Sequence, residues 1–552
     1  MNIKEIMSPW ERLVGLLKLE KRDLLQVIYY AIFSGLLALT LPLGIQAIIN
    51  LIQGAQVSTS WVVLVILVTL GVAFVGVLQL MQMRIIETIQ QRIFTRASFE
   101  FTYRFPKIKM NELRNYYPPE LANRFFDTLN IQKGLSKILI DIPAAILQIL
   151  FALILLSFYH PFFIAFGILL LLLIYVVFKF TAQKGMDTSL LESKHKYKVA
   201  HWIQEVARAV VSFKLSGKTS LAINKNDDLV NDYLKARESH FRILVIQFMQ
   251  MIGFKVIVTA GLLLIGGLLV LNQEMNIGQF VAAEIIILLV ITSVEKLILG
   301  LESFYDVLTS LEKMGQVVDK DIEMQEGDEP DFKDNFSLEL DKVFYKVPQR
   351  EQSILNNISL RIKPKSRILV RGESGSGKSS LLRLIAGVIE PTKGSVYIDE
   401  YSLKNINLNH YRSHLGLSLA DETPFEGTIR ENITFGNKDI SDDQLLWAID
   451  KVGLNQFIKE SQQGLNTVLY PEGKQISFTV AKRIVLARAI VSKPKILILE
   501  DPLEHFEPNE VNRLISFLTD DANPWALVVV SMSNDWSQNC TQVITLNNGE
   551  II

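Results

Sequence analysis

A glycine-rich stretch in the second half of the chain has the spacing of residues that bind phosphate groups. It reads G-x-x-x-x-G-K-S from Gly372 to Ser379. Glycines let backbone N–H groups approach phosphate oxygens closely, and a following helix N-terminus adds the positive end of its dipole. We expect Lys378 to reach the β- and γ-phosphates and the Ser379 hydroxyl to bind Mg²⁺. The predicted nucleotide-binding residues are Gly372, Glu373, Ser374, Gly375, Ser376, Gly377, Lys378, Ser379 and Ser380.

The stretch lies between a strand and a helix, which is the context that such a phosphate loop requires. Arg367 to Val370 reads as a short strand, and Ser380 to Ile385 reads as a helix. Other strand-like runs alternate with helical stretches along 336–552, and this alternation predicts an α/β domain. We therefore expect a nucleotide-binding domain at 336–552.

The first 301 residues contain long runs without charge. A helix rises 1.5 Å per residue, so about 20 apolar residues cross the ~30 Å core of a bilayer. We predict six membrane-spanning helices at about 24–51, 61–83, 138–159, 161–181, 247–271 and 279–301. The average composition hides this pattern, because 49% of the 552 residues are hydrophobic and 20% are charged. The prediction is a membrane all-α domain at 23–318, with the lipid bilayer as its surroundings.

Lysine and arginine are distributed unevenly between the loops of this domain. The short loops at 52–60, 159–161 and 272–276 contain neither residue, whereas the long segments 84–137 and 182–246 contain many. The positive-inside rule places the long segments in the cytoplasm, together with both termini and the α/β domain. The long segments are predicted to extend the membrane helices into the cytoplasm.

Two shorter segments flank the membrane domain. Residues 1–22 predict an amphipathic helix, because Ser8, Pro9 and Glu11 form an N-cap, first-position proline and capping-box pattern. This helix can lie in the membrane interface, which is the environment we expect, or pack on protein. Residues 319–335 are acidic and poor in apolar side chains, which predicts a linker. The net charge of −1 gives no indication of nucleic acid as a partner.

The combination of six spans, long cytoplasmic extensions and a C-terminal phosphate-loop domain resembles a half-transporter of the ABC exporter family. Residues 483–489 resemble the helix after the family's signature, and 495–499 resemble its Walker B strand. Segments 120–125 and 214–217 stand where the family has its two coupling helices. The resemblance implies ATP and Mg²⁺ as cofactors and a second half-transporter chain as partner, in a homodimer or a heterodimer. It also implies a bacterial inner membrane and leaves an envelope adaptor open as a further partner.

The catalytic positions depart from the family's pattern. By resemblance, the Walker B aspartate falls on Glu500, which would bind Mg²⁺ together with Ser379. The catalytic glutamate falls on Asp501, which is one methylene shorter. The remaining substituted positions are the signature at 476–480 with Phe478 in place of a glycine, the Q-loop glutamine at Ala420, the switch histidine at Met532 and the D-loop at 504–507.

The position of the aromatic residue that stacks on adenine in this family is also substituted. It falls on Val347, and Tyr345 lies two residues earlier on the same strand face. Tyr345 is therefore the predicted replacement. Phosphoryl transfer depends on positioning and charge stabilisation, so these departures together predict an ATP-binding domain with weakened hydrolysis.

Three functional hypotheses follow from the sequence. The first is an ATP-binding exporter subunit that moves a substrate out of the cytoplasm, with weak or absent hydrolysis. The second is a non-transporting, ATP-gated scaffold or regulator, and the third is an active ATPase that uses Asp501. Charged residues inside the last two spans bear on the choice. Lys255, Glu284 and Glu295 line a substrate or ion path, or they snorkel to the membrane surface, or Lys255 and Glu295 form an interhelical pair.

Overall fold

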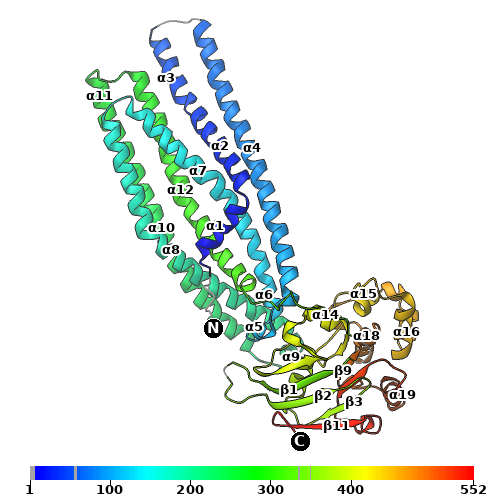
Figure 1. Ribbon diagram of the computed structural model, residues 1–552. Helices are drawn as coiled ribbons and strands as arrows, with labels where there is room; N and C mark the ends of the chain where they lie inside the picture. Colours follow the sequence, from blue (N-terminus) through cyan, green and yellow to red (C-terminus); the bar gives the residue numbers. More distant parts are fainter. Residues whose placement is uncertain (1–6, 55–58, 333–335, 349) are drawn as a thin grey trace. The chain divides into compact units, whose positions relative to one another are not determined.

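The computed structural model describes residues 7–54, 59–332, 336–348 and 350–552 (Figure 1). Parts of the predicted N-terminal helix, first loop and linker lie outside these ranges. The chain divides into two compact units. Unit 1 comprises Met1–Pro106 and Asn115–Lys320, and unit 2 comprises Lys107–Arg114 and Asp321–Ile552.

Unit 1 is a bundle of helices, many of them longer than a bilayer is thick. They are α1 (Pro9–Leu19), α2 (Lys21–Ala38), α3 (Thr40–Gln53), α4 (Thr59–Arg104), α6 (Pro118–Ala122), α7 (Asp127–Ser157), α8 (Phe162–Arg208), α9 (Val210–Leu215), α10 (Leu221–Gly261), α11 (Gly267–Leu271) and α12 (Ile277–Val318). The 46 residues of α4 and the 47 of α8 exceed the ~20 that a span requires, which agrees with helical extensions beyond the bilayer.

Five segments in the described part of the chain are long and apolar enough to cross a membrane. They are Lys21–Gln53, Thr59–Lys107, Pro118–Ser157, Leu221–Leu271 and Ile277–Val318. They contain four of the six predicted spans and cover another, 138–159, as far as Ser157. The fourth predicted span, 161–181, lies at the start of α8, where the apolar segment among the described residues is the shorter Phe162–Leu172.

The first predicted span is two helices rather than one. Helix α2 ends at Ala38 and α3 begins at Thr40, with Pro42 in the first turn of α3. Proline has no backbone N–H, so a continuous helix would leave the Ala38 carbonyl without its donor four residues later. The break therefore follows directly from the proline.

Helix α12 is the centre of unit 1. It packs against α7, α3, α8 and α10, and half of its most apolar window is buried. Gly134 lets α7 approach it closely, since a Cβ at Gly134 would lie 2.4 Å from a methyl carbon of Val307.

The predicted N-terminal helix is present as α1 and packs on protein. Ser8 and Glu11 form the expected capping box. Leu13 is buried, the Trp10 ring lies 5.9 Å from the Phe304 ring, and the Arg12 guanidinium pairs with Asp319 just beyond α12. These contacts favour packing on protein rather than the expected membrane interface.

Unit 2 contains the predicted α/β domain, built on two main sheets. A four-stranded antiparallel sheet has the order β2-β1-β4-β5, and a six-stranded sheet has the order β12-β11-β3-β10-β9-β6. The strands of the two sheets are β1 (Leu338–Tyr345), β2 (Leu355–Ile362), β3 (Arg367–Arg371), β4 (Lys393–Ile398), β5 (Tyr401–Ser402), β6 (Leu415–Ser418), β9 (Ile496–Glu500), β10 (Ala526–Val530), β11 (Gln542–Asn547) and β12 (Glu550–Ile551).

The helices of unit 2 are short, and its apolar residues form one core on each face of the parallel sheet. On β3, Ile368 and Val370 face one core and Leu369 faces the other, as the two-residue period of a strand requires. The helices are α5 (Met110–Leu113), α13 (Lys378–Ile385), α14 (Leu408–Ser413), α15 (Ile429–Thr434), α16 (Asp442–Val452), α17 (Asn455–Glu460), α18 (Phe478–Ile490) and α19 (Pro508–Leu518).

The main segment of unit 2 begins at Asp321 rather than at residue 336, so much of the predicted linker is part of it. Glu323 is buried against Arg412, and Phe332 belongs to the core. The acidic composition suggested a solvated connection, but one of these carboxylates, Glu323, is buried and paired with an arginine.

Candidate nucleotide-binding site

The phosphate loop lies at the end of the central parallel strand of unit 2. Strand β3 pairs with β10 and β11 in parallel, and the loop leads from β3 into α13, which starts at Lys378. Gly372 has φ +150°, and a Cβ there would lie 2.2 Å from the Leu546 carbonyl oxygen. Gly377 has φ +104°, and a Cβ there would meet the Ile354 carbonyl oxygen at 2.8 Å. Only glycine fits both positions, which explains the spacing of the motif.

The Lys378 ammonium group lies inside the curve of this loop. Its Nζ donates to the carbonyl oxygens of Gly372 and Glu373, each at 2.7 Å. The Ser376 hydroxyl is buried beside it and has no hydrogen-bond partner among the described residues. A cation, an unpaired hydroxyl and a helix N-terminus at one place are donors of the kind that phosphate oxygens accept from.

Ser379 and Glu500, which sequence reasoning assigned to Mg²⁺, lie together. Glu500 ends β9, the Ser379 hydroxyl donates to its Oε1, and the Ala420 N–H donates to its Oε2 at 3.3 Å. Glu500 is only 7% exposed. Mg²⁺ prefers hydroxyl and carboxylate oxygens, so this pair fits the metal. The tertiary structure brings them together because parallel strands end at the same edge of the sheet.

Asp501, the predicted catalytic base, follows directly in a left-handed conformation with φ +41°. Its backbone N–H donates to the Val530 carbonyl oxygen at 2.9 Å. Burial of its carboxyl raises the pKa of Asp501, and the neighbouring carboxylates of Glu504 and Glu500 raise it further. This carboxyl therefore holds a proton more readily than an ordinary aspartate.

The raised pKa of Asp501 predicts a pH dependence for any ATP turnover by this chain. A general base acts only when deprotonated, so turnover is expected to fall about tenfold per pH unit below the Asp501 pKa. The midpoint should lie above the usual aspartate pKa of about 3.9. The pH profile of ATP turnover measures this dependence. If Asp501→Asn shows the same fall in turnover at low pH, Asp501 is not the base.

The same shift predicts a contribution of Asp501 to folding. The folded chain binds this proton more tightly than the unfolded chain, so the carboxyl favours folding at low pH. This contribution is lost as the pH rises through the folded-state pKa of Asp501.

The substituted signature presents an aromatic surface. Phe478 begins α18, is 49% exposed and packs edge-on against His505, with 5.3 Å between the ring centroids. The Ser477 hydroxyl accepts from the Val480 N–H, so the helix end is capped by its own chain. A side chain of this size stands where the family's glycine would let backbone approach a phosphate.

Sequence reasoning missed Lys482, which supplies a polar contact at the Q-loop position. Lys482 is 5% exposed, and its Nζ donates to the Ala420 carbonyl oxygen at 3.1 Å. The feature of the sequence that could have indicated this contact is a lysine on the buried face of the helix that resembles the family's post-signature helix. The switch-histidine position, Met532, is instead 67% exposed.

The placement of Tyr345 does not support its predicted stacking on adenine. Tyr345 is only 7% exposed in the core of unit 2, and its hydroxyl donates to Asn111 Oδ1 at 3.4 Å. Val347 is equally buried. Strand β1 ends at Tyr345, so Val347 lies beyond the strand on which the sequence placed both residues, and the ring of Tyr345 has no open face toward a base.

The segment that packs into unit 2 from between the second and third spans is 107–114, which includes α5. The predicted coupling segment 120–125 instead belongs to unit 1, where Arg124 and Leu121 are buried. The apolar Leu121 and the i,i+4 pair of Glu120 with Arg124 suit packing inside the helical unit.

Lys255 and Glu295 form an interhelical ion pair within unit 1. Lys255 Nζ on α10 lies 2.6 Å from Glu295 Oε2 on α12, and each side chain is about one-third exposed. This is one of the arrangements that the sequence left open. No partner of Glu284 is found among the described residues.

Comparisons with known proteins agree with these two units. The family model described as ABC transporter transmembrane region matches residues 24–294, and the model described as ABC transporter matches residues 355–504. The fold is similar to the structure of a bacterial Atm1-family ABC exporter with ATP bound, with a TM-score of 0.84 and 17% identity. That match covers 96% of this chain and 94% of the other.

Curated relatives include leukotoxin translocation ATP-binding proteins LktB. The protein from Mannheimia haemolytica is 26% identical over 352 residues, covering 63% of this chain and 49% of the relative. The protein from Bibersteinia trehalosi is 27% identical over 319 residues, covering 57% and 45%. The chain thus spans about half the length of the curated relatives it matches. With a transmembrane region followed by an ATP-binding domain, this integral membrane protein belongs to the ABC transporter family as a half-transporter.

Proposed function

We propose that this chain is an ATP-binding exporter subunit of a bacterial inner membrane that moves a substrate out of the cytoplasm, with weak or absent hydrolysis of its own. The observation that carries the proposal is the convergence of Lys378, Ser379 and Glu500 at the end of β3 and β9. The loop would hold the ATP phosphates, with Ser379 and Glu500 on Mg²⁺. When bound, MgATP would supply the phosphate groups, and the residues of the phosphate loop would hold them.

The weakness of hydrolysis rests on the groups around this centre. Asp501 is a shorter base with a raised pKa, and the exposed residues Ala420 and Met532 replace polar side chains of the family. Phe478 replaces a glycine whose N–H would reach the γ-phosphate across a dimer. Phe478 keeps its backbone N–H, but its side chain hinders the close approach of that N–H to a phosphate, and losing a single such donor contact typically slows turnover by about 10²–10³-fold. Binding can therefore persist where hydrolysis is slow.

The partner is a second ABC half-transporter chain. In a homodimer, both sites would combine this phosphate loop with this substituted signature. In a heterodimer, the partner's signature would complete the site at Lys378, while Phe478 would face the partner's loop. A further proposed partner is an envelope adaptor, for which the sole ground is the analogy with protein exporters.

ATP turnover by the purified chain in lipid tests the proposal. We expect MgATP binding with turnover no higher than that of Lys378→Ala and Asp501→Asn. Turnover that both substitutions abolish would show an active ATPase that uses Asp501. Binding without turnover, together with a co-purifying second ABC chain, supports the exporter subunit. Reconstitutions that move no substrate and retain stable non-ABC partners would instead favour an ATP-gated scaffold.

A further inference from the structure

Residues 321–332, here called the strap, connect two parts of unit 2 that are far apart in sequence. One end of the strap forms a short antiparallel ladder with the segment 107–114. Ile322 bridges with Ile108, the Glu323 N–H donates to the Lys107 carbonyl oxygen at 2.7 Å, and the Lys109 N–H donates to the Asp321 carbonyl oxygen at 3.0 Å. Backbone bonds on both sides of the bridge hold the strap and 107–109 in one register.

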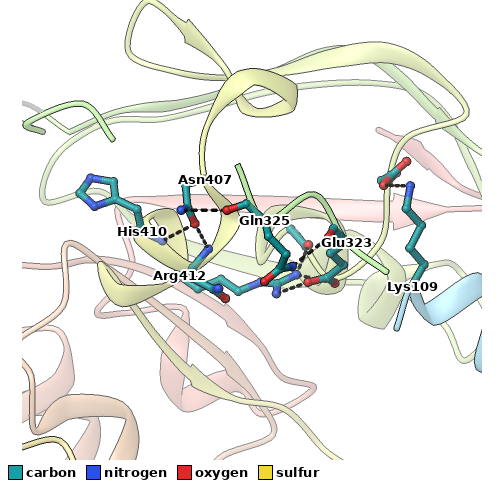
Figure 2. A network of polar contacts seen from close by, with 9 residues as sticks. Lys109, Glu323, Gln325, Asn407, His410 and Arg412 are labelled. Carbon is teal, nitrogen blue, oxygen red and sulfur yellow. Dashed lines mark hydrogen bonds and ion pairs between the residues drawn. The ribbon is translucent and has the colours of Figure 1, made fainter. Parts of the chain in front are cut away.

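The rest of the strap is anchored beside α14. The Asp328 N–H donates to the Asn405 carbonyl oxygen at 2.8 Å, and the Asn407 N–H returns a bond to the Asp328 carbonyl oxygen at 3.0 Å. His410 Nε2 lies 2.9 Å from the Pro330 carbonyl oxygen, and its ring stacks on Phe332. The strap is therefore a packed element along its length, and Figure 2 shows the polar contacts of Glu323 with Arg412 and of Gln325 with Asn407.

Arg412 joins the strap to the nucleotide helix. Its guanidinium makes two hydrogen bonds to the Glu323 carboxylate, at 2.6 and 2.9 Å, and its Nη2 also donates to the Gly387 carbonyl oxygen at 2.5 Å. Gly387 has φ +67° and lies just past the C-terminus of α13, whose first residue is Lys378. The neighbouring Tyr411 hydroxyl donates to the Ile385 carbonyl oxygen at 2.6 Å. Two consecutive residues of α14 thus hold the far end of the helix that begins at the phosphate loop.

The chemistry of this contact suits a rigid connection. A guanidinium fork matches both carboxylate oxygens and fixes their orientation as well as their distance. Glu323 is 9% exposed and the Arg412 side chain is 23% exposed, so solvent screens this pair little. The ion pair of Lys109, in the segment 107–114, with Glu390 is far more exposed and contributes little rigidity.

We propose that Arg412 is a positioning residue of the nucleotide site, through which MgATP at the start of α13 and the segment 107–114 bias each other's position. The inference rests on the proposed nucleotide binding. At the Q-loop position, the Ala420 side chain makes no hydrogen bond, so it provides no polar side-chain link from the metal site. Unit 2 contains another polar link from the nucleotide site. It leads from α13 through Gly387, Arg412 and Glu323 to residues 107–109.

The test measures nucleotide affinity and hydrogen exchange on the full chain in lipid nanodiscs. Glu323→Gln keeps the shape of the side chain but removes its charge, and Arg412→Lys keeps the charge but removes the fork. Asp442→Asn is the matched control, because it breaks the exposed Arg430–Asp442 pair at 2.6 Å elsewhere in unit 2. Thermal unfolding of each variant verifies that it is folded.

In the wild type we expect MgATP to slow backbone exchange in 107–114 and 321–325. The two variants of this ion pair, Glu323→Gln and Arg412→Lys, here called the strap variants, should bind MgATP within about threefold of the wild type. This change in affinity is small beside the five-fold or larger couplings typical of linked sites. The strap variants should nevertheless lose most of the exchange response, while Asp442→Asn keeps it. A simple loss of stability would raise exchange with and without MgATP and leave the difference between them intact.

Two results would overturn the inference alone, and a third would also overturn the proposed function. The inference fails if both strap variants keep the full MgATP-dependent difference. It also fails if the wild type binds MgATP without any response in 107–114. An absence of MgATP binding by the folded wild type overturns the proposed function and the inference with it.

Discussion

Lys378→Ala is expected to lose MgATP binding by roughly a hundredfold in Kd, because the substitution removes charge-assisted contacts worth about 3 kcal/mol in total. The ammonium group lies within the loop, held at 2.7 Å by two loop carbonyl oxygens, and is placed to turn toward phosphate oxygens. Alanine cannot reach them. Equilibrium binding of a fluorescent ATP analogue to the purified chain in lipid measures the change.

The control for this prediction is Lys474→Ala. Lys474 is an exposed lysine of unit 2 that pairs with Glu472 at 3.1 Å and lies outside the phosphate loop. Its substitution should leave the affinity unchanged. An unchanged affinity in Lys378→Ala would mean that the loop does not bind the triphosphate.

Lys255→Leu is expected to destabilise the membrane unit by about 3 kcal/mol, because it leaves the Glu295 carboxylate unpaired at membrane depth. In the structure, Glu295 Oε2 accepts from Lys255 Nζ at 2.6 Å. Replacing both partners removes the unpaired charge, so Lys255→Leu with Glu295→Leu should recover most of the stability. Thermal unfolding in lipid nanodiscs compares the two variants.

The double variant also separates structure from transport. Recovered stability together with recovered export would make the pair structural, whereas recovered stability without export would place it on the substrate path. Equal stability of the single and double variants would contradict the prediction. The matched control is Lys296→Leu, which replaces an exposed lysine one residue further along α12.

Local patterns predicted much of this protein because they reflect local physics. The glycine spacing from 372 to 379 is a backbone requirement, and the structure shows which atoms would collide with a side chain at Gly372 and Gly377. Apolar run lengths likewise predicted the spans, since the thickness of a bilayer sets the number of residues. The break after Ala38 was not predicted, although Pro42, which lacks a backbone N–H, accounts for it.

Other features depend on contacts between distant residues, which a single sequence does not reveal. Tyr345 has the right residue type and strand face for stacking, but packing buries it and turns its hydroxyl to Asn111. The acidic strap resembled a linker because the partner of Glu323 is 89 residues away, at Arg412. Lys482 resembled an ordinary helix residue until the fold placed it at Ala420.

The sequence by itself determined the phosphate loop, the membrane helices and their order, since each follows from residues close together in the chain. Only the tertiary structure decided that Ser379 meets Glu500, that Lys255 pairs with Glu295, and that Arg412 ties the strap to the end of the nucleotide helix. These contacts depend on which strands and helices become neighbours. Charge type and spacing alone leave many pairings open, and burial in the folded chain selects among them.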